Sequence, residues 1–273
     1  NASSNINDLQ TGAVAGVNAT GQNIKITVFD SGTIHNTHEQ LGTARAINKE
    51  TGSYSKTAHT TQVNTVLIGN GNATGTFSVG GIIYNKEKAK GVLPLGSTDN
   101  HKFQLTTLGN NYEKLATLPD LNISNHSYGI NVGWSYITAV DGVVYPTVGW
   151  YWIGNYEMNT TDTYSGVYAP QDESFDKIVY NNPNQIIVKS TGNYYGLQPV
   201  AGVKKYRYNS TLGRYVEFET SDVIPAANCS AGYNCIGYGS LAKNIITVGA
   251  VNQLATTGNE YTTSADVVKA DIS

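Results

Sequence analysis

The chain has 273 residues, a length that suits one large domain or two small ones. Charged residues make up 14% of it and the formal net charge is -3, so it lacks the basic excess of proteins that bind nucleic acid. No stretch approaches the roughly 20 apolar residues of a membrane helix, so we expect no membrane insertion. No signal peptide pattern is present, and we expect the chain to begin at a processed N-terminus. With 29 Gly, 19 Tyr and one Met, the composition favours a secreted or cell-surface protein that is rich in loops.

The first strong pattern along the chain is a strand that ends at an acidic residue. A short helix is predicted within 8–17, and residues 24–30 then alternate before running apolar through Val28 and Phe29. This run stops at Asp30, which Ser31 and Gly32 follow. The pattern predicts a buried parallel strand that delivers the Asp30 carboxylate to the carboxyl edge of a sheet. Open α/β sheets place their ligands and chemistry at that edge.

The elements that follow alternate between helix-like and strand-like segments. Residues 59–69 have helical spacing of apolar side chains and begin with His59, and a second short helix is predicted over 111–118. Strands are predicted after 89–95 and over 121–129, 185–193 and 244–251. Residues 31–58 and 69–81 are expected to be loops, 130–175 loop plus a helix, and 194–240 a long irregular excursion. This alternation predicts an α/β fold with a parallel sheet.

The two cysteines, Cys229 and Cys235, lie in the irregular excursion. A short disulfide in an oxidising compartment is the favoured interpretation, and a two-cysteine metal site is the alternative. No histidine lies near them in the sequence, which counts against zinc. No Asp-rich loop resembles a calcium-binding consensus, so we expect no cofactor or metal and leave calcium unassigned.

Three polar residues at predicted strand ends and a helix start match the parts needed for acyl transfer. Asp30 supplies a carboxylate, His59 an imidazole and Asn193 a side-chain amide. A carboxylate orients the imidazole, the imidazole acts as general base, and an amide donates to an oxyanion. A nucleophile is missing from this set.

Six motifs in order give the sequence a resemblance to the subtilisin-like serine proteases (subtilases), most of all to secreted bacterial ones. The motifs lie at 26–32, 58–63, 89–94, 123–129, 190–193 and 242–251. Each motif is weak alone, but their order is that of the family, with the acid before the histidine. The resemblance spans nearly the whole chain. It implies that 1–273 is the N-terminal portion of one catalytic domain, a subtilisin-like three-layer sandwich with a central, mostly parallel sheet flanked by helices.

The resemblance also implies an activity and a set of site residues. It implies a secreted serine endopeptidase that acts on a peptide or protein substrate, with catalytic Asp30 and His59 and with Asn193 as oxyanion donor. The substrate would pair as an added strand with Ser127, Tyr128 and Gly129. The remaining substrate-binding residues implied by the motifs are Ser190, Thr191 and Gly192.

Two departures from the family pattern bear on activity. The family's Gly-Thr-Ser-x-x-x-Pro motif is not reached before Ser273, so no catalytic serine is assigned. We expect a nicked chain, whose second polypeptide supplies the serine and stays bound by packing. Thr60 and Gln62 replace the glycine and the second histidine of the family's His-Gly-Thr-His-Val motif. A β-branched Thr60, where glycine would allow close approach, predicts an altered or less active site.

Other interpretations of the same residues stay open. The main alternative is a catalytically impaired pseudoprotease that serves as a binding or adhesion module. A carbohydrate-active protein ranks last, because Asp30 is the only strand-end carboxylate identified. The Trp-rich stretch 130–170 is expected to provide core packing and a groove rim more than a sugar platform. We expect a structural hydrogen bond for His126, and exposed loop positions for His35 and His38 in preference to a metal site with Glu39.

Overall fold

The computed structural model describes residues 6–14, 16–42, 44–86, 89–154, 156–157, 160, 162, 164–230 and 236–251. The chain divides into two compact units. In the described part, unit 1 comprises the residues up to Tyr128 together with Ile178–Lys189, and unit 2 comprises Gly129–Lys177 together with the described residues of 190–252. The expectation of one catalytic domain over the whole chain stays a prediction.

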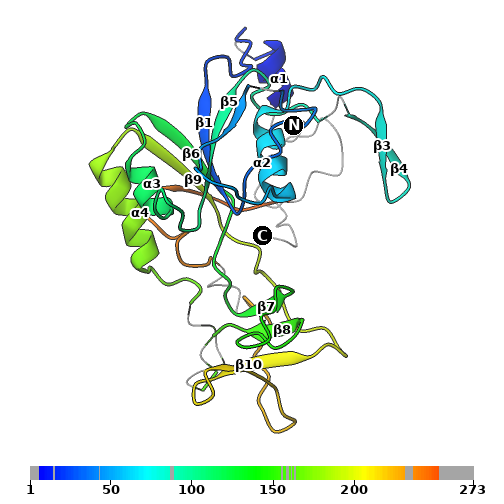
Figure 1. Ribbon diagram of the computed structural model, residues 1–273, viewed down its shortest axis with the longest axis vertical. Helices are drawn as coiled ribbons and strands as arrows, with labels where there is room; N and C mark the ends of the chain where they lie inside the picture. Colours follow the sequence, from blue (N-terminus) through cyan, green and yellow to red (C-terminus); the bar gives the residue numbers. More distant parts are fainter. Residues whose placement is uncertain are drawn as a thin grey trace. The chain divides into compact units, whose positions relative to one another are not determined.

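A six-stranded sheet forms the centre of the fold, and its order is β12-β9-β6-β1-β5-β2 (Figure 1). Its strands are β1 (Lys25–Asp30), β2 (Ala46–Asn48), β5 (Ser97–Lys102), β6 (Asn122–His126), β9 (Gln185–Ser190) and β12 (Ile246–Val248). The pairs β1–β5, β1–β6, β2–β5 and β6–β9 are parallel. The predicted α/β class with a parallel sheet is therefore confirmed, and so is the place of β1, which lies inside the sheet and ends at Asp30.

Helices accompany the sheet in unit 1. They are α1 (Ile6–Thr11), α2 (Ala58–Ile68) and α3 (Asn111–Ala116), and α4 (Pro170–Asn181) spans the boundary between the units. Helix α2 packs on β1 and β5, and Figure 1 shows α2 and α3 on opposite faces of the sheet. Helix α3 begins with a complete capping box, because Asn110 accepts from Glu113 N–H and the Glu113 carboxylate accepts from Asn110 N–H. None of the described helices is long and apolar enough to cross a bilayer.

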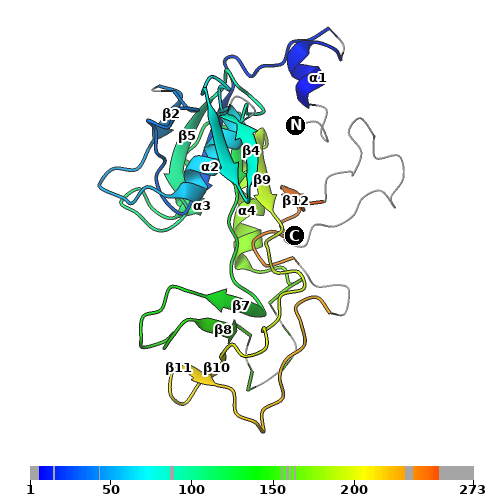
Figure 2. The same ribbon diagram turned by 90° about the vertical axis from the view of Figure 1, so that its right-hand side faces the viewer.

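One predicted loop in unit 1 is instead a hairpin. Strand β3 (Thr76–Val79) lies within 69–81, the segment expected to be a glycine-rich loop, and pairs antiparallel with β4 (Ile82–Asn85), which follows it (Figures 1 and 2). Gly80 and Gly81 at its tip both have positive φ, of 57° and 82°, which is the requirement of a two-residue hairpin turn. The prediction interpreted the glycines as a sign of a loop and overlooked the short apolar runs of β3 and β4 on either side of Gly80 and Gly81.

Unit 2 has its own four-stranded sheet, in the order β11-β10-β8-β7. The strands are β7 (Trp134–Ile137), β8 (Gly149–Trp152), β10 (Lys205–Asn209) and β11 (Arg214–Glu217). The prediction of an irregular excursion over 194–240 was wrong for β10 and β11, and the prediction of loop before the helix in 130–175 was wrong for β7 and β8. Trp134, Trp150 and Trp152 are buried in one cluster, which confirms core packing for the tryptophans.

Candidate active site

The centre of the candidate site is a contact between Asp30 and His59. The His59 ring nitrogen Nδ1 lies 2.8 Å from Asp30 Oδ2 and 3.0 Å from Oδ1. The Asp30 side chain is 1% exposed, whereas the His59 side chain is 54% exposed. A carboxylate only accepts hydrogen bonds, so the ring proton of neutral His59 lies on Nδ1. The Nε2 atom therefore keeps its lone pair and can accept a proton at an accessible surface.

The residue after Asp30 also holds its carboxylate in place. Ser31 N–H donates to Asp30 Oδ1 at 2.6 Å, and the Ser31 hydroxyl lies 3.1 Å from the same oxygen. The backbone carbonyl of Asp30 accepts from Phe103 N–H at 2.9 Å, which ties the strand end to the segment after β5. A buried carboxylate needs such donors, because water cannot solvate it.

The start of α2 sets the position of His59. Thr57 is the N-cap, and its side chain accepts from Thr60 N–H. His59 is therefore the second residue of the helix, and its ring leaves the first turn toward the end of β1. A Cβ on Gly32 would lie 2.3 Å from Thr57 Cγ2 and 2.8 Å from Ser55 O. The chain thus needs glycine at position 32 for the segment before α2 to pass close to the end of β1.

Thr60 occupies the position where a glycine was expected, and the fold accommodates its side chain. It is fully buried, its hydroxyl lies 2.6 Å from Thr57 Oγ1, and it donates to Gly32 O at 3.3 Å. The β-branched side chain therefore coexists with the Asp30–His59 contact. The close approach that we expected at position 60 is provided by Gly32.

A buried polar network fixes α2 on the sheet. Asn64 donates to Asn100 Oδ1 at 2.5 Å and to Thr60 O at 2.8 Å, and it accepts from the Thr98 hydroxyl at 2.5 Å. Asn64, Thr98 and Asn100 are all almost fully buried. Because Asn64 lies five positions after His59 in the same helix, this network sets the height and rotation of the turn that carries the imidazole.

The two histidines of the central strands are structural. Phe29 stacks between His101 and His126, with ring centroids 5.2 Å and 4.8 Å away. His126 Nδ1 lies 2.8 Å from the Tyr128 hydroxyl and Nε2 lies 3.0 Å from the Ser124 hydroxyl, which confirms the structural hydrogen bonds predicted for it. Burial holds the pKa of His126 well below its usual value, and burial also lowers the pKa of His101.

Tyr128, predicted to contact substrate, is held by three further side chains besides His126. Its ring stacks on Phe103 at 4.3 Å, and its hydroxyl accepts from Asn111 Nδ2 at 3.0 Å. The Lys189 ammonium lies 4.3 Å from the centre of the Tyr128 ring and donates to the Tyr128 carbonyl. Burial raises the pKa of the Tyr128 hydroxyl well above its usual value. The phenol is therefore a fixed neutral group, and Ser127 beside it accepts from Asn125 Nδ2 at 2.9 Å.

The other predicted site residues belong to unit 2. Ser190 ends β9, its carbonyl accepts from the Ser240 hydroxyl at 2.9 Å, and Thr191 N–H donates to Val248 O at 3.0 Å. Gly192 has a φ of 105°, where a side chain would be strained. Asn193 is exposed, and Gly129 lies beside the Tyr194 ring. Since these residues and the Asp30–His59 pair belong to different units, the oxyanion role of Asn193 stays a prediction.

The loop histidines and the predicted disulfide have separate outcomes. His35 and His38 are exposed, as expected, and no set of three or more His, Cys, Asp or Glu side chains in the described ranges is arranged to hold a metal ion. Cys235 lies outside the described residues, so the Cys229–Cys235 disulfide stays a prediction.

Sequence reasoning missed two residues that shape the site. Thr57 caps α2, and the Thr-x-x-Thr spacing just before His59 was available as a signal for the helix start. Lys189 is buried at the end of β9 and anchors Tyr128, and a lysine that interrupts the apolar run Ile186–Val188 was the available signal.

Comparison with known proteins adds no assignment. No protein-family model matches the chain, and no curated protein matches it. The functional argument therefore depends on the motifs and on the geometry of the residues themselves.

Proposed function

We propose that the protein is a secreted or cell-surface serine endopeptidase of the subtilisin type. The observation that carries the proposal is the Asp30–His59 contact, which joins a buried carboxylate to an accessible imidazole at the end of a central parallel strand. The finer fold assignment, a subtilisin-like sandwich, belongs to the same proposal. It is supported by the order of the six motifs and by α2 and α3 on opposite faces of the sheet.

Each group has a defined role in the proposed reaction. A serine hydroxyl attacks the scissile carbonyl, and His59 Nε2 takes its proton and later returns it to the leaving amine. Asp30 keeps the Nδ1 tautomer of His59 and stabilises the imidazolium that forms. The serine comes from a segment beyond Ser273 or from a second polypeptide. Asn193 donates to the oxyanion, and the substrate pairs with Ser127, Tyr128 and Gly129.

A fluorophosphonate probe tests the proposal on the purified protein, since it labels an activated serine. We expect labelling of a polypeptide that carries the serine, which intact mass identifies, and loss of that labelling in His59→Ala. Asp30→Asn keeps the shape of the side chain but favours the wrong tautomer, so we expect turnover to fall by about 10⁴. Undiminished labelling in His59→Ala would contradict the proposal.

Asn193→Ala tests the oxyanion role separately. We expect turnover to fall by about 10²–10³ with KM nearly unchanged, a magnitude taken from the equivalent donor of subtilisin itself. A rise in KM at unchanged turnover would show that Asn193 binds the ground state of the substrate and has no oxyanion role.

The second candidate is a pseudoprotease that binds peptides without cleaving them. It is favoured by Gln62, which replaces the second histidine of the family motif. If no component of the purified protein reacts with the probe while peptides still bind, this candidate replaces the first.

A further inference from the structure

Three rings stack side by side across the central strands of unit 1. The register of the sheet places Phe29 of β1 directly opposite His101 of β5 and His126 of β6. The two imidazoles are tilted by only 19° and 9° from the plane of the Phe29 ring. Phe29 and His126 are fully buried, and His101 is 8% exposed. This stack therefore lies in the core, and its middle ring belongs to the residue directly before Asp30.

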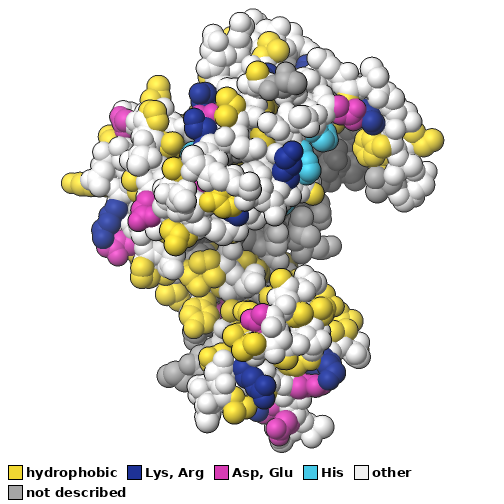
Figure 3. Space-filling model, viewed as in Figure 1, with side chains coloured by type: hydrophobic (Ala, Val, Ile, Leu, Met, Phe, Trp, Pro, Cys, Tyr) yellow, Lys and Arg dark blue, Asp and Glu magenta, His cyan; other side chains and the backbone are white. Residues whose placement is uncertain are grey.

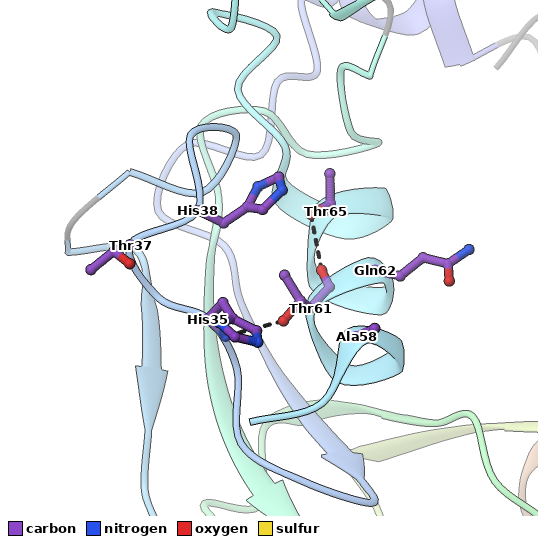
Figure 4. Close-up of a pocket in the computed structure, with 7 residues that line it drawn as sticks. All are labelled: His35, Thr37, His38, Ala58, Thr61, Gln62 and Thr65. Atoms are coloured by element: carbon purple, nitrogen blue, oxygen red, sulfur yellow. Dashed lines mark hydrogen bonds between the residues drawn. The ribbon is translucent and has the colours of Figure 1, made fainter. Parts of the chain in front are cut away.

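The other three of the five histidines are accessible to water. The His59 side chain is 54% exposed, and His35 and His38 lie at the wall of an open hollow of about 650 Å³ beside α2 (Figure 4). These three rings can take up a proton in contact with water. The two stacked imidazoles cannot, because a charged ring in the core costs much more free energy than a neutral one.

His126 is the ring of the stack that resists a proton most. Its two nitrogens lie 2.8 Å from the Tyr128 hydroxyl and 3.0 Å from the Ser124 hydroxyl, which suit a neutral imidazole. Burial, and after it the positive charge of Lys189, hold the pKa of His126 well below its usual value. Any open form in which water reaches this ring therefore takes up the proton first as the pH falls below about 6.5.

His101, on the other side of Phe29, has an acidic neighbour. Its Nδ1 is buried without a hydrogen-bond partner and lies 3.6 Å from Glu50 Oε1. Burial lowers the pKa of His101, but the Glu50 charge opposes this effect. The titratable and charged side chains around the stack are Lys189 and Tyr128 beside His126, and Glu50, Lys114, Asp99 and Lys49 around His101.

The stack is connected to Asp30 along two routes. Phe29, the middle ring, precedes Asp30 in β1. The Tyr128 hydroxyl, which contacts His126, belongs to a ring that stacks on Phe103 at 4.3 Å, and Phe103 N–H donates to the Asp30 carbonyl at 2.9 Å. If the His126 ring leaves the stack, the end of β1 loses support on both routes.

We propose that the His101–Phe29–His126 stack is an acid-sensitive switch, which releases the end of β1 and the Asp30–His59 contact when His126 takes up a proton. The importance of this switch for catalysis rests on the proposed function. One proton is bound on opening, so the ratio of open to closed molecules rises up to about tenfold for each pH unit below about 6.5. The site is then complete near neutral pH and is taken apart reversibly in acid.

Native-state hydrogen exchange tests the switch without requiring catalysis. Protection factors, which are corrected for the pH dependence of the chemical exchange step, are compared at about pH 7.5 and about pH 5.5. The reporters are Phe103 N–H and Ser31 N–H, whose acceptors are the carbonyl and the carboxylate of Asp30. We expect their protection to fall by about tenfold. Gly91 N–H, which donates to Gly69 O at the other end of α2, should stay protected.

Two variants with the same substitution show which ring carries the response. His126→Gln removes the titrating group and should abolish the fall in protection. The matched control is His101→Gln, on the opposite side of the Phe29 ring, which should leave most of the fall in place. Should His126→Gln not fold, Lys189→Met provides the second test. It removes the positive charge that disfavours a proton on His126, so the closed form tolerates the proton better and the fall should be smaller.

The outcomes separate the switch from the proposed function. A fall at Gly91 as large as at Phe103, or a fall that persists in His126→Gln, would overturn the switch. If the fluorophosphonate probe labels no component while the fall at Phe103 depends on His126, the protease proposal fails and the switch stands. If the probe labels a serine and the protection at Phe103 does not change with pH, the switch fails and the protease proposal stands.

Discussion

The cores of the two units are stabilised by different kinds of interaction. In unit 1 the helix that carries His59 is fixed by directional hydrogen bonds among Asn64, Thr98 and Asn100. In unit 2 the core consists of stacked and edge-to-face rings, among them Trp134, Trp152 and Tyr151. Aromatic side chains bury a large apolar area, and that contribution is non-directional, whereas a satisfied hydrogen-bond network fixes one geometry. The comparison teaches that unit 1 uses its core to position a side chain and unit 2 uses its core for stability.

Charges of both signs are interspersed on one face of the described part of the molecule. On the face shown in Figure 3, Lys and Arg side chains alternate with Asp and Glu, without a large area of one sign. This agrees with the small net charge of -3.

The substitution with the largest expected effect on stability is Trp134→Ala, which tests the difference between the two cores. Trp134 is fully buried, packs against Trp152 and Phe218, and donates from its ring to Pro225 O at 3.1 Å. We expect a loss of about 3–5 kcal/mol in the unfolding free energy of unit 2, measured by denaturant titration. NMR shifts of the His59 ring should stay unchanged in the folded protein. A shifted His59 signal would contradict the division of roles.

Asn64→Ala should have a smaller effect on stability and a larger one on the site. It removes the partner of two buried polar groups, Asn100 Oδ1 and the Thr98 hydroxyl, so we expect a loss of about 1–3 kcal/mol. The His59 ring should also lose its single position, which the same NMR measurement reports. Asn122→Ala is the control in the same sheet, because the Asn122 side chain contacts β1 through Thr27 and makes no bond to α2.

The pH dependence of stability sharpens the account of unit 1. The lowered pKa of buried His126 means that the unfolded state binds its proton first as the pH falls. Stability from this group is therefore present above the unfolded histidine pKa and decreases below about pH 6.5. We expect His126 to contribute a slope of up to about 1.4 kcal/mol per pH unit. His126→Gln should remove this contribution and leave that of His101, whose pKa burial also lowers. Burial of Glu50 would raise the pKa of its carboxyl, but hydrogen bonds from donors including Lys114 outweigh burial and lower it. The stability that ionised Glu50 contributes is therefore lost only at more acidic pH.

Thr60→Gly is the mildest change and introduces the glycine that the subtilase motif has at this position. It removes the contact with Thr57 Oγ1 and places glycine in a helix, at a cost of about 1 kcal/mol. We expect proteolytic rate constants within about threefold of the parent chain, because the Asp30–His59 contact does not depend on the Thr60 side chain. A large rate increase in a peptide assay would show that Thr60 impairs the site.

The sequence allowed β1, β5, β6, β9, β12 and the acid–histidine pair to be predicted, because their signals are local. The three-residue strand β2 was missed, since it lies in residues 31–58, which were expected to be a loop. The run through Val28 and Phe29 to Asp30 and the helical spacing after His59 both specify their elements without help from distant residues. The sheet of unit 2 could not be predicted, since β8 and β10 are far apart in the chain and pair only through tertiary contacts. The Lys189–Tyr128 contact was missed for the same reason.

The steric requirement at Gly32 limits what the Asp-Ser-Gly motif says about activity. Its hydrogen atom faces Thr57 and Ser55, where no larger substituent fits, and neither contact involves the histidine. A descendant that had lost its imidazole would still require glycine after the acidic and hydroxyl residues, merely to fold. The tripeptide Asp-Ser-Gly is thus a marker of how the end of a strand is packed. A protein with this packing would need the glycine whether or not it had catalytic activity.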